Sequence, residues 1–110
     1  MTRRVMVRQG DVLIVSVKAV PETAKQETAE ERIILAHGEL TGHHHSIVQE
    51  LDSPAVTVWS DGEEDRFLNV LRECSLFHQE HSTITIPPGT YRVVRQREYR
   101  APDISRQVAD

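Results

Sequence analysis

The chain has a single cysteine, Cys74, among its 110 residues. One cysteine cannot form a disulfide within the chain, and a cysteine-based zinc site needs several thiolates, so neither is expected here. Cys74 lies in an apolar stretch, which indicates a small core residue rather than a nucleophile. The absence of an internal disulfide fits a reducing compartment, and we expect the protein to be cytoplasmic.

Long apolar runs are also missing. No stretch approaches the ~20 residues that a membrane-spanning helix needs, and no apolar segment follows the arginines near the start of the chain, so we expect no membrane contact and no signal peptide. The net charge is -4, with basic residues toward both ends and acidic residues in the middle. This distribution lacks the broad basic face that sequence-independent binding of duplex DNA requires.

The motifs of several enzyme classes are absent as well. There is no Gly-x-Ser-x-Gly elbow, no phosphate-binding loop and no dinucleotide-binding fingerprint, so the sequence does not support these hydrolase and nucleotide-binding classes. The length, with 38% hydrophobic and 27% charged residues, indicates one soluble domain over residues 1–110.

The chain instead contains short apolar segments separated by turn residues, such as Asp61-Gly62 and Pro87-Pro88-Gly89. Such spacing is typical of a small all-β protein. We expect an antiparallel barrel or sandwich of about seven short strands, an exposed loop at 21–31, and either a short C-terminal helix or a tail at 102–110. The strand candidates are 12–17, 32–36, 43–48, 55–59, 67–71, 74–78, 82–86 and 90–100.

Five of the six histidines lie in two short clusters, Gly-His-His-His at 42–45 and His-Gln-Glu-His at 78–81. Imidazole titrates near neutral pH and is a common metal ligand, so the clusters predict one site built from two strands or their ends. In an extended strand, alternation places His43 and His45 on one face, and His78 and Glu80 on one face of theirs. The alternative is that these histidines are only solvated residues of polar strands and turns.

The last predicted strand carries a second unusual pattern. Alternation places five side chains on one face, which are Tyr91, Val93, Arg95, Arg97 and Tyr99. Arginines between tyrosines are unexpected in a core, and both residue types suit the binding of phosphate and of stacked rings. We therefore take Arg95, Arg97, Tyr99 and Glu80 as candidate substrate-binding residues. A solvent-facing strand whose arginines pair with acidic neighbours is the alternative.

Three functions use these residues. The first is metal-independent cleavage of RNA-type phosphodiesters, in which one histidine takes the ribose 2′-hydroxyl proton and another protonates the leaving oxygen. Its candidate catalytic residues are His43, His45, His78 and His81, and it needs no cofactor. The second is binding of zinc or another first-row metal by His43, His45, His78 and Glu80. The third is a non-catalytic interaction module.

The order of the motifs adds a resemblance. Gly-His-x-His and His-x-Glu-His are followed by Ile-Pro-Pro-Gly-Thr-Tyr-Arg-Val and Arg-Gln-Arg-Glu-Tyr, over residues 37–99. This order resembles a group of small bacterial and phage proteins and is loosely similar to CRISPR-associated ring nucleases. The resemblance implies metal-free cleavage of cyclic oligoadenylate, a small cyclic RNA ligand, by a symmetric homodimer. The positions that it marks for testing are His43, His45, His78, His81 and Arg97.

Overall fold

The computed structural model of the protein describes residues 6–37, 43–62 and 65–95. These segments contain ten β-strands and no helix, which confirms the predicted all-β class. The strands are β1 (Met6–Gln9), β2 (Val12–Ser16), β3 (Lys25–Gln26), β4 (Arg32–His37), β5 (His44–Val48), β6 (Val56–Asp61), β7 (Asp65–Val70), β8 (Cys74–Leu76), β9 (Ile84–Ile86) and β10 (Gly89–Arg95). The helix or tail expected at 102–110 lies outside the described residues.

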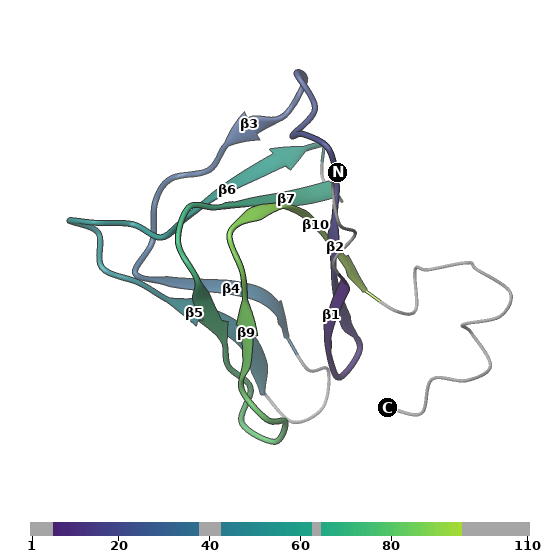
Figure 1. Ribbon diagram of the computed structural model, residues 1–110, viewed down its shortest axis with the longest axis vertical. Helices are drawn as coiled ribbons and strands as arrows, with labels where there is room; N and C mark the ends of the chain where they lie inside the picture. Colours follow the sequence, from purple (N-terminus) through teal and green to yellow (C-terminus); the bar gives the residue numbers. More distant parts are fainter. Residues whose placement is uncertain (1–5, 38–42, 63–64, 96–110) are drawn as a thin grey trace, which may run out of the picture.

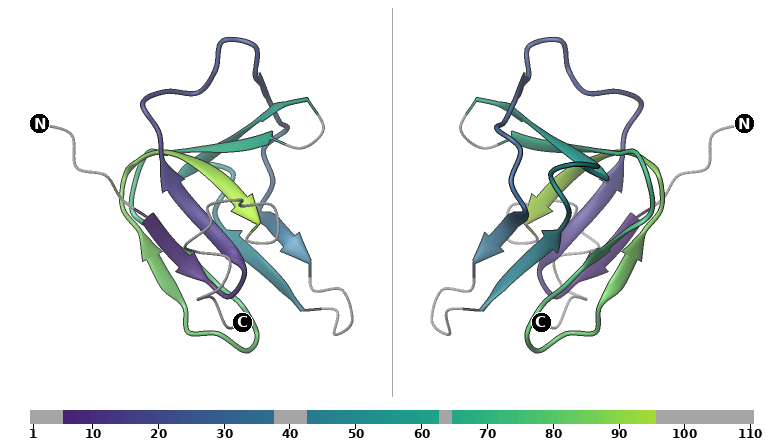
Figure 2. Two further views of the ribbon diagram at one scale, coloured as in Figure 1. Left: turned by 90° about the vertical axis from the view of Figure 1, so that its right-hand side faces the viewer. Right: turned by 90° about the vertical axis from the view of Figure 1, so that its left-hand side faces the viewer.

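One six-stranded antiparallel sheet dominates the fold, in the order β1-β2-β10-β7-β6-β3. Two hairpins, β4–β5 and β8–β9, complete it. Figures 1 and 2 show both hairpins toward the same end of the molecule as β1 and β2, with β3, β6 and β7 toward the other end. In the described part of the chain, β1 and β3 are the edges of the sheet, so it is sandwich-like and not a closed barrel.

Two of the ten strands were not predicted. β1 is short and half polar, and it is a strand because it pairs along its whole length with β2. β3 falls inside the expected loop at 21–31 and consists of two exposed residues that pair with β6. Pairing with a neighbour, rather than local propensity, therefore decides both elements. The predicted strand at 90–100 is described only as far as Arg95.

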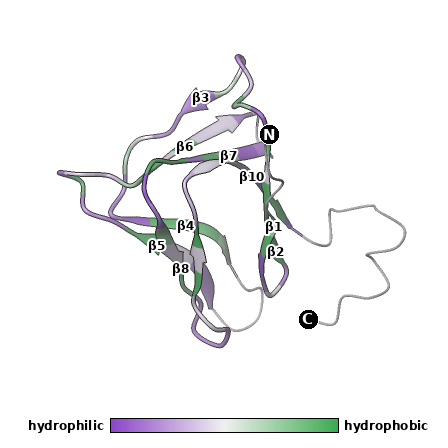
Figure 3. Cartoon of the chain, viewed as in Figure 1, coloured by the Kyte–Doolittle hydropathy of each residue, from purple (hydrophilic) through white to green (hydrophobic). Residues whose placement is uncertain are grey.

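The core lies between the large sheet and the two hairpins. It is built from buried aliphatic side chains of both parts, among them Val12, Ile14, Ile33, Ile47, Leu68, Leu76 and Ile86. Figure 3 shows the resulting pattern, with hydrophobic residues along β2 and a hydrophilic connection between β8 and β9. This core holds the hairpins against β1 and β2, and the histidine clusters lie at the ends of those hairpins.

Tyr91 corrects one sequence interpretation. The face of β10 that carries Tyr91 and Val93 was expected to bind a ligand or meet solvent, but Tyr91 is 1% exposed and belongs to the core. Its hydroxyl donates a hydrogen bond to the carbonyl oxygen of Pro87 at 2.6 Å, which satisfies the only polar group of the buried side chain. Val93 packs against the core. The Arg95 side chain, at the end of the strand, lies outside the core and pairs with Asp11.

Among the described residues, no helix has the length and apolar composition that crossing a membrane requires.

Candidate functional site

An antiparallel contact between the two histidine clusters builds the site. Ser46 in β5 and Phe77 just after β8 exchange both backbone hydrogen bonds, at 2.9 and 2.8 Å. In an antiparallel pair the next partners follow in opposite directions along the chain, so His45 lies opposite His78 and His43 lies opposite Glu80. Side chains two residues apart on one strand share a face, and this register therefore places His43, His45, His78 and Glu80 on one face. His81 is three residues from His78 and joins them because the chain bends at 79–81.

Four imidazole rings lie together there. The ring centroid of His78 is 4.3 Å from that of His45, 4.6 Å from that of His81 and 5.7 Å from that of His43. The rings of His45 and His81 are nearly parallel, with centroids 6.2 Å apart. The structure thus brings together all four histidines that the sequence marked, and His78 is in contact with the other three. We call His43, His45, His78 and His81 the histidine cluster.

Gln9, at the end of β1, fixes the His45 ring. The Gln9 side-chain nitrogen donates hydrogen bonds to the carbonyl oxygens of Leu76 and Ser82, both at 2.9 Å. The Gln9 side-chain oxygen therefore lies 2.8 Å from His45 Nδ1 and must accept a hydrogen bond from it. In the neutral ring, His45 Nδ1 carries the proton and Nε2 keeps a lone pair that can take a proton or a metal ion.

His78 has the opposite arrangement. The backbone N–H of Glu80 donates to His78 Nδ1 at 3.0 Å. The lone pair of neutral His78 is therefore on Nδ1, and its proton is on Nε2. His45 thus offers an Nε2 acceptor and His78 an Nε2 donor, although the two rings are in contact.

Burial keeps these two rings uncharged. His45 is 4% exposed and His78 is 8% exposed. Loss of hydration, followed by the neighbouring His78, lowers the pKa of His45 to about 4, while the carboxylate of Asp11 opposes the shift. The pKa of His78 is also lowered, first by burial and then by His81 and His43. At neutral pH both rings are therefore neutral, which is the form that acts as a base or a ligand.

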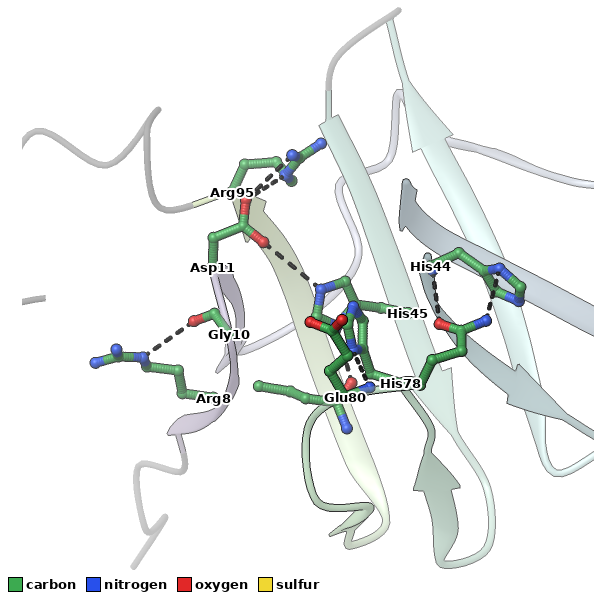
Figure 4. A network of polar contacts seen from close by, with 10 residues as sticks. Arg8, Gly10, Asp11, His44, His45, His78, Glu80 and Arg95 are labelled. Atoms are coloured by element: carbon green, nitrogen blue, oxygen red, sulfur yellow. Dashed lines mark hydrogen bonds and ion pairs between the residues drawn. The ribbon is translucent and has the colours of Figure 1, made fainter. Parts of the chain in front are cut away.

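Asp11 and Arg95 border the cluster. Asp11 lies in the β1–β2 turn, directly after Gly10, and its Oδ1 lies 3.6 Å from His45 Nε2. Its Oδ2 accepts hydrogen bonds from Arg95 Nη2 at 3.1 Å and Nε at 3.4 Å (Figure 4). Because His45 is neutral near pH 7, the Asp11–His45 contact is a polar contact and not an ion pair, whereas Asp11–Arg95 is an ion pair.

The turn at Gly10 lets the cluster approach β1 and β2. Gly10 has a φ of +59°, and a Cβ atom placed there would lie 2.8 Å from His81 Nε2 and 3.3 Å from His45 Cε1. Glycine therefore serves two purposes, because it accepts the left-handed conformation and leaves the volume that the two rings occupy.

His44 belongs to a separate set of contacts. Its backbone N–H donates to the Gln79 side-chain oxygen at 2.9 Å, and its ring nitrogens lie 3.3 Å from Gln79 Nε2 and 3.4 Å from Arg32 Nη1. This agrees with the expectation that His44 points away from His43 and His45, and Figure 4 shows it apart from His45 and His78.

The remaining predicted residues have different positions. Glu80 is at the rim, where one carboxylate oxygen is 3.3 Å from His43 Nδ1 and the side chain is 63% exposed. Arg95 is connected to the cluster by its ion pair with Asp11. Arg97 and Tyr99 lie outside the described residues. Cys74 is half-buried against the core, as expected, and burial raises its pKa to about 11.

Sequence reasoning missed Gln9, Gly10 and Asp11. These three consecutive residues are more than 30 positions from the first histidine of the cluster, and no spacing connects them with it. The only local signal was the glycine turn before a strongly apolar strand, which predicts a hairpin but not what its tip contacts.

Comparison with known proteins places the chain in a family. A family described as a domain of unknown function, DUF8820, matches residues 8–96. The chain belongs to this family. The match includes all four histidines of the cluster together with Gln9, Gly10, Asp11 and Arg95. No curated protein and no solved structure matches the chain.

Proposed function

We propose that the protein binds a divalent first-row transition metal, with zinc as the reference ion, through His43, His45, His78 and His81. One observation carries the proposal, namely the contact of four imidazoles around His78, two of them at the start of β5 and two in the connection between β8 and β9. A metal–nitrogen bond of about 2.0–2.1 Å puts each ring centroid about 3.2 Å from the metal, so tetrahedral ligands have centroids about 5 Å apart. The four centroid distances of 4.3–6.2 Å lie around that value.

The neutral state of the buried rings and the hydrogen bonds that orient them also favour metal binding. Metal ions bind neutral imidazole, and His45 and His78 have lowered pKa values. A metal-binding histidine usually donates its other N–H to an oxygen that fixes the ring, and His45 does so to Gln9. The oxygen of Glu80 beside His43 Nδ1 could serve His43 in the same way. In this arrangement Glu80 supports a ligand instead of being one.

Binding requires some ring rotation. In the described part of the chain, no three His, Cys, Asp or Glu side chains are arranged as a metal site as they stand. One ring that would have to change is His78, whose Nδ1 accepts a hydrogen bond from the Glu80 backbone while Nε2 carries the proton. Rotation of this ring about its Cβ–Cγ bond exposes a lone pair to the centre of the cluster, and side-chain rotations of this kind are fast.

Metal content of the purified protein tests the proposal. We expect about one zinc per chain after dialysis against zinc and then against metal-free buffer, with removal by a chelator. His81→Ala and His78→Gln should each lower zinc affinity by at least about 100-fold. His44→Ala, in β5 next to His45 but outside the cluster, should not. Zinc retained equally by all three variants, with folding verified by circular dichroism, would refute the site.

A second candidate function rests on the complementary tautomers of His45 and His78. We propose it as metal-independent cleavage of RNA-type phosphodiesters, with cyclic oligoadenylate as substrate and a homodimer enclosing the ring. His45 Nε2 would accept the 2′-hydroxyl proton and His78 Nε2 would donate one to the leaving oxygen. The metal site is favoured because rings 4.3 Å apart leave no room for a phosphate between them, and because Arg95 is already paired with Asp11.

A cleavage assay with and without a chelator distinguishes metal binding from metal-independent cleavage. Labelled cyclic oligoadenylates of several ring sizes should be cleaved in EDTA if the second function holds, and this activity should be lost in His78→Gln. No cleavage with or without EDTA, together with bound zinc, supports the metal site alone. If neither zinc nor cleavage is found and the cluster variants keep every binding partner, a non-catalytic interaction module is the better description.

A further inference from the structure

We propose that one face of strands β5 and β8 binds the same face of a second copy of the chain, which gives a two-fold symmetric dimer. We call this surface the outer face. Its side chains come from alternate residues of the two strands and their ends, which are His44, Ser46, Val48, Glu50, Glu73, Ser75, Phe77 and Gln79.

The outer face is separate from the histidine cluster. Alternation puts it on the opposite side of β5 from His45, and Figure 4 shows His44 apart from His45 and His78. The proposal therefore does not depend on the function of the cluster. The dimer also differs from one that encloses a ligand between two histidine clusters.

The middle of the outer face carries two exposed apolar side chains on one diagonal. Ser46 lies opposite Phe77, so antiparallel pairing places Val48 opposite Ser75. Val48 is 64% exposed and Phe77 is 47% exposed. Each strand thus presents one large and one small side chain, in opposite order along the face. Neighbouring apolar side chains that remain in solvent on a sheet face favour burial against another molecule.

A two-fold axis matches these large and small side chains. The axis lies parallel to the outer face, runs across the strands, and passes midway between the Ser46–Phe77 and Val48–Ser75 pairs. Rotation about it exchanges the two levels, so Phe77 of one copy lies over Ser75 of the other, and Val48 lies over Ser46. A surface with this arrangement is complementary to itself, which a two-fold interface between identical chains requires. The two sheets pack as an aligned sandwich.

A cavity lies where the Phe77 ring of the second copy arrives. Its volume is about 320 Å³, and Val48 and Ser75 of the outer face are among the residues that line it. Half-buried Cys74 and buried Ala55 form part of its wall. A hollow opposite a projecting aromatic ring lets the two copies approach closely, and rings packed in this way often dominate the affinity of an interface.

The two ends of the outer face differ in charge. At one end, Arg32 Nη1 from β4 lies 3.4 Å from His44 Nε2. At the other end, Glu50 and Glu73 line the cavity, and neither forms an ion pair with another residue of the described segments. One basic side chain, that of Arg72, also lines the cavity, so two carboxylates stand against one guanidinium there.

The charges select the direction of the axis. Rotation about an axis across the strands reverses the strand direction and keeps β4 beside β5, so Arg32 of one copy lies near Glu50 of the other, and symmetry repeats the pair. An axis parallel to the strands would instead place the two acidic ends together. Charge pairs across an interface fix orientation more than they add affinity, and here they favour the first axis.

The first experiment is sedimentation equilibrium of full-length protein over a concentration series, with chelator present so that a metal cannot join two chains. We expect a reversible dimer. Phe77→Ala should weaken it by at least about 30-fold. Met6→Ala is the matched control, because Met6 is a large apolar residue that is 50% exposed but lies in β1, outside the outer face. It should change the dimer affinity by less than about twofold. Circular dichroism verifies that both variants fold.

The second experiment exchanges the charges. Arg32→Glu or Glu50→Arg alone places like charges opposite each other and should weaken the dimer by at least about tenfold. When the two variants are mixed, one chain of each restores both pairs of opposite charge. The mixed dimer should therefore form in preference to either homodimer, which native mass spectrometry of the mixture measures.

Each outcome decides the proposal. Protein that stays monomeric at every concentration overturns it, and so does a dimer as stable in Phe77→Ala as in Met6→Ala, because its interface would lie elsewhere. A dimer that Phe77→Ala weakens, but in which the charge variants show no preference for each other, rules out the proposed axis. None of these results depends on zinc binding, so the metal site stands or falls separately.

Discussion

His45 and His78 are cross-strand neighbours, with ring centroids 4.3 Å apart, because Ser46 and Phe77 beside them form an antiparallel backbone bridge. This one bridge joins the β4–β5 hairpin to the β8–β9 hairpin. It converts two histidine clusters separated by some thirty residues of sequence into one buried site.

Acid should destabilise the protein through His45. Its folded-state pKa of about 4 lies below the ordinary value of 6.5, so the unfolded chain takes up a proton first as pH falls. Stability is therefore full above about pH 6.5 and is lost between pH 6.5 and about 4, by up to about 3 kcal/mol from this residue. Urea unfolding of metal-free protein at pH 7 and pH 4.5 measures the loss.

His45→Gln and His44→Gln compare a buried ring inside the cluster with a partly buried one outside it. The first should reduce the pH dependence of the unfolding free energy between pH 7 and 4.5, and the second should leave it as in the wild type. An equal pH dependence in His45→Gln would mean that the acid sensitivity comes from other groups.

Gly10→Ala should reduce metal affinity beyond the effect of backbone strain. Its Cβ would lie 2.8 Å from His81 Nε2, which forces that ring to move. Gly62→Ala is the control, because Gly62 has a φ of +76° and its added Cβ meets nothing within 4 Å. Both variants should lose about 1 kcal/mol of stability to the left-handed backbone, and only Gly10→Ala should weaken zinc binding, by at least about tenfold. Equal zinc affinities, measured by competition with a chelating dye, would count against close packing of His81 on the turn.

Gln9→Met should both destabilise the fold and loosen the metal site. It removes two hydrogen bonds to the carbonyl oxygens of Leu76 and Ser82 and the acceptor of His45 Nδ1–H. Each buried group left without a partner costs about 1–3 kcal/mol, and loss of a group that supports a ligand lowers metal affinity about 10–100-fold.

Gln49→Met provides a comparison for this variant. Gln49 is also buried and hydrogen-bonds to the backbone at Glu30, Ala55 and Val56, but it does not touch the histidine cluster. Its substitution should lower the denaturation midpoint and leave zinc affinity unchanged. If both glutamine variants lost zinc alike, the effect would be one of general stability.

Cys74 should react slowly with alkylating reagents. Burial, and to a smaller extent Glu73, raises its pKa from 9.0 to about 11, so the thiolate fraction at neutral pH falls about 100-fold. Cys74 also lines a cavity of about 320 Å³, so access alone would not protect it. We expect iodoacetamide labelling at pH 7.5 to be far slower in the folded protein than in urea. Similar rates in both states would contradict the raised pKa.

Local patterns were sufficient for most of the strands and for half of the site. Branched residues bounded by Gly and Pro mark β2, β6 and β10, and the alternation of His43 and His45 on one strand correctly gave the face that they share. Tyr91 shows the limit of such reasoning. Its position two residues from Val93 gave its face, but only packing decides whether that face meets core or solvent.

The amino-acid sequence by itself determined the all-β class, the turns and the two clusters of imidazoles, because strand propensity, turn chemistry and residue type are local properties. The tertiary structure decided the register that joins Ser46 to Phe77, and with it which imidazoles meet. It also brought Gln9, Gly10 and Asp11 to the cluster and lowered the pKa of His45. Those features depend on burial and on contacts between residues far apart in the chain, which only the packing of the hairpins against β1 and β2 creates.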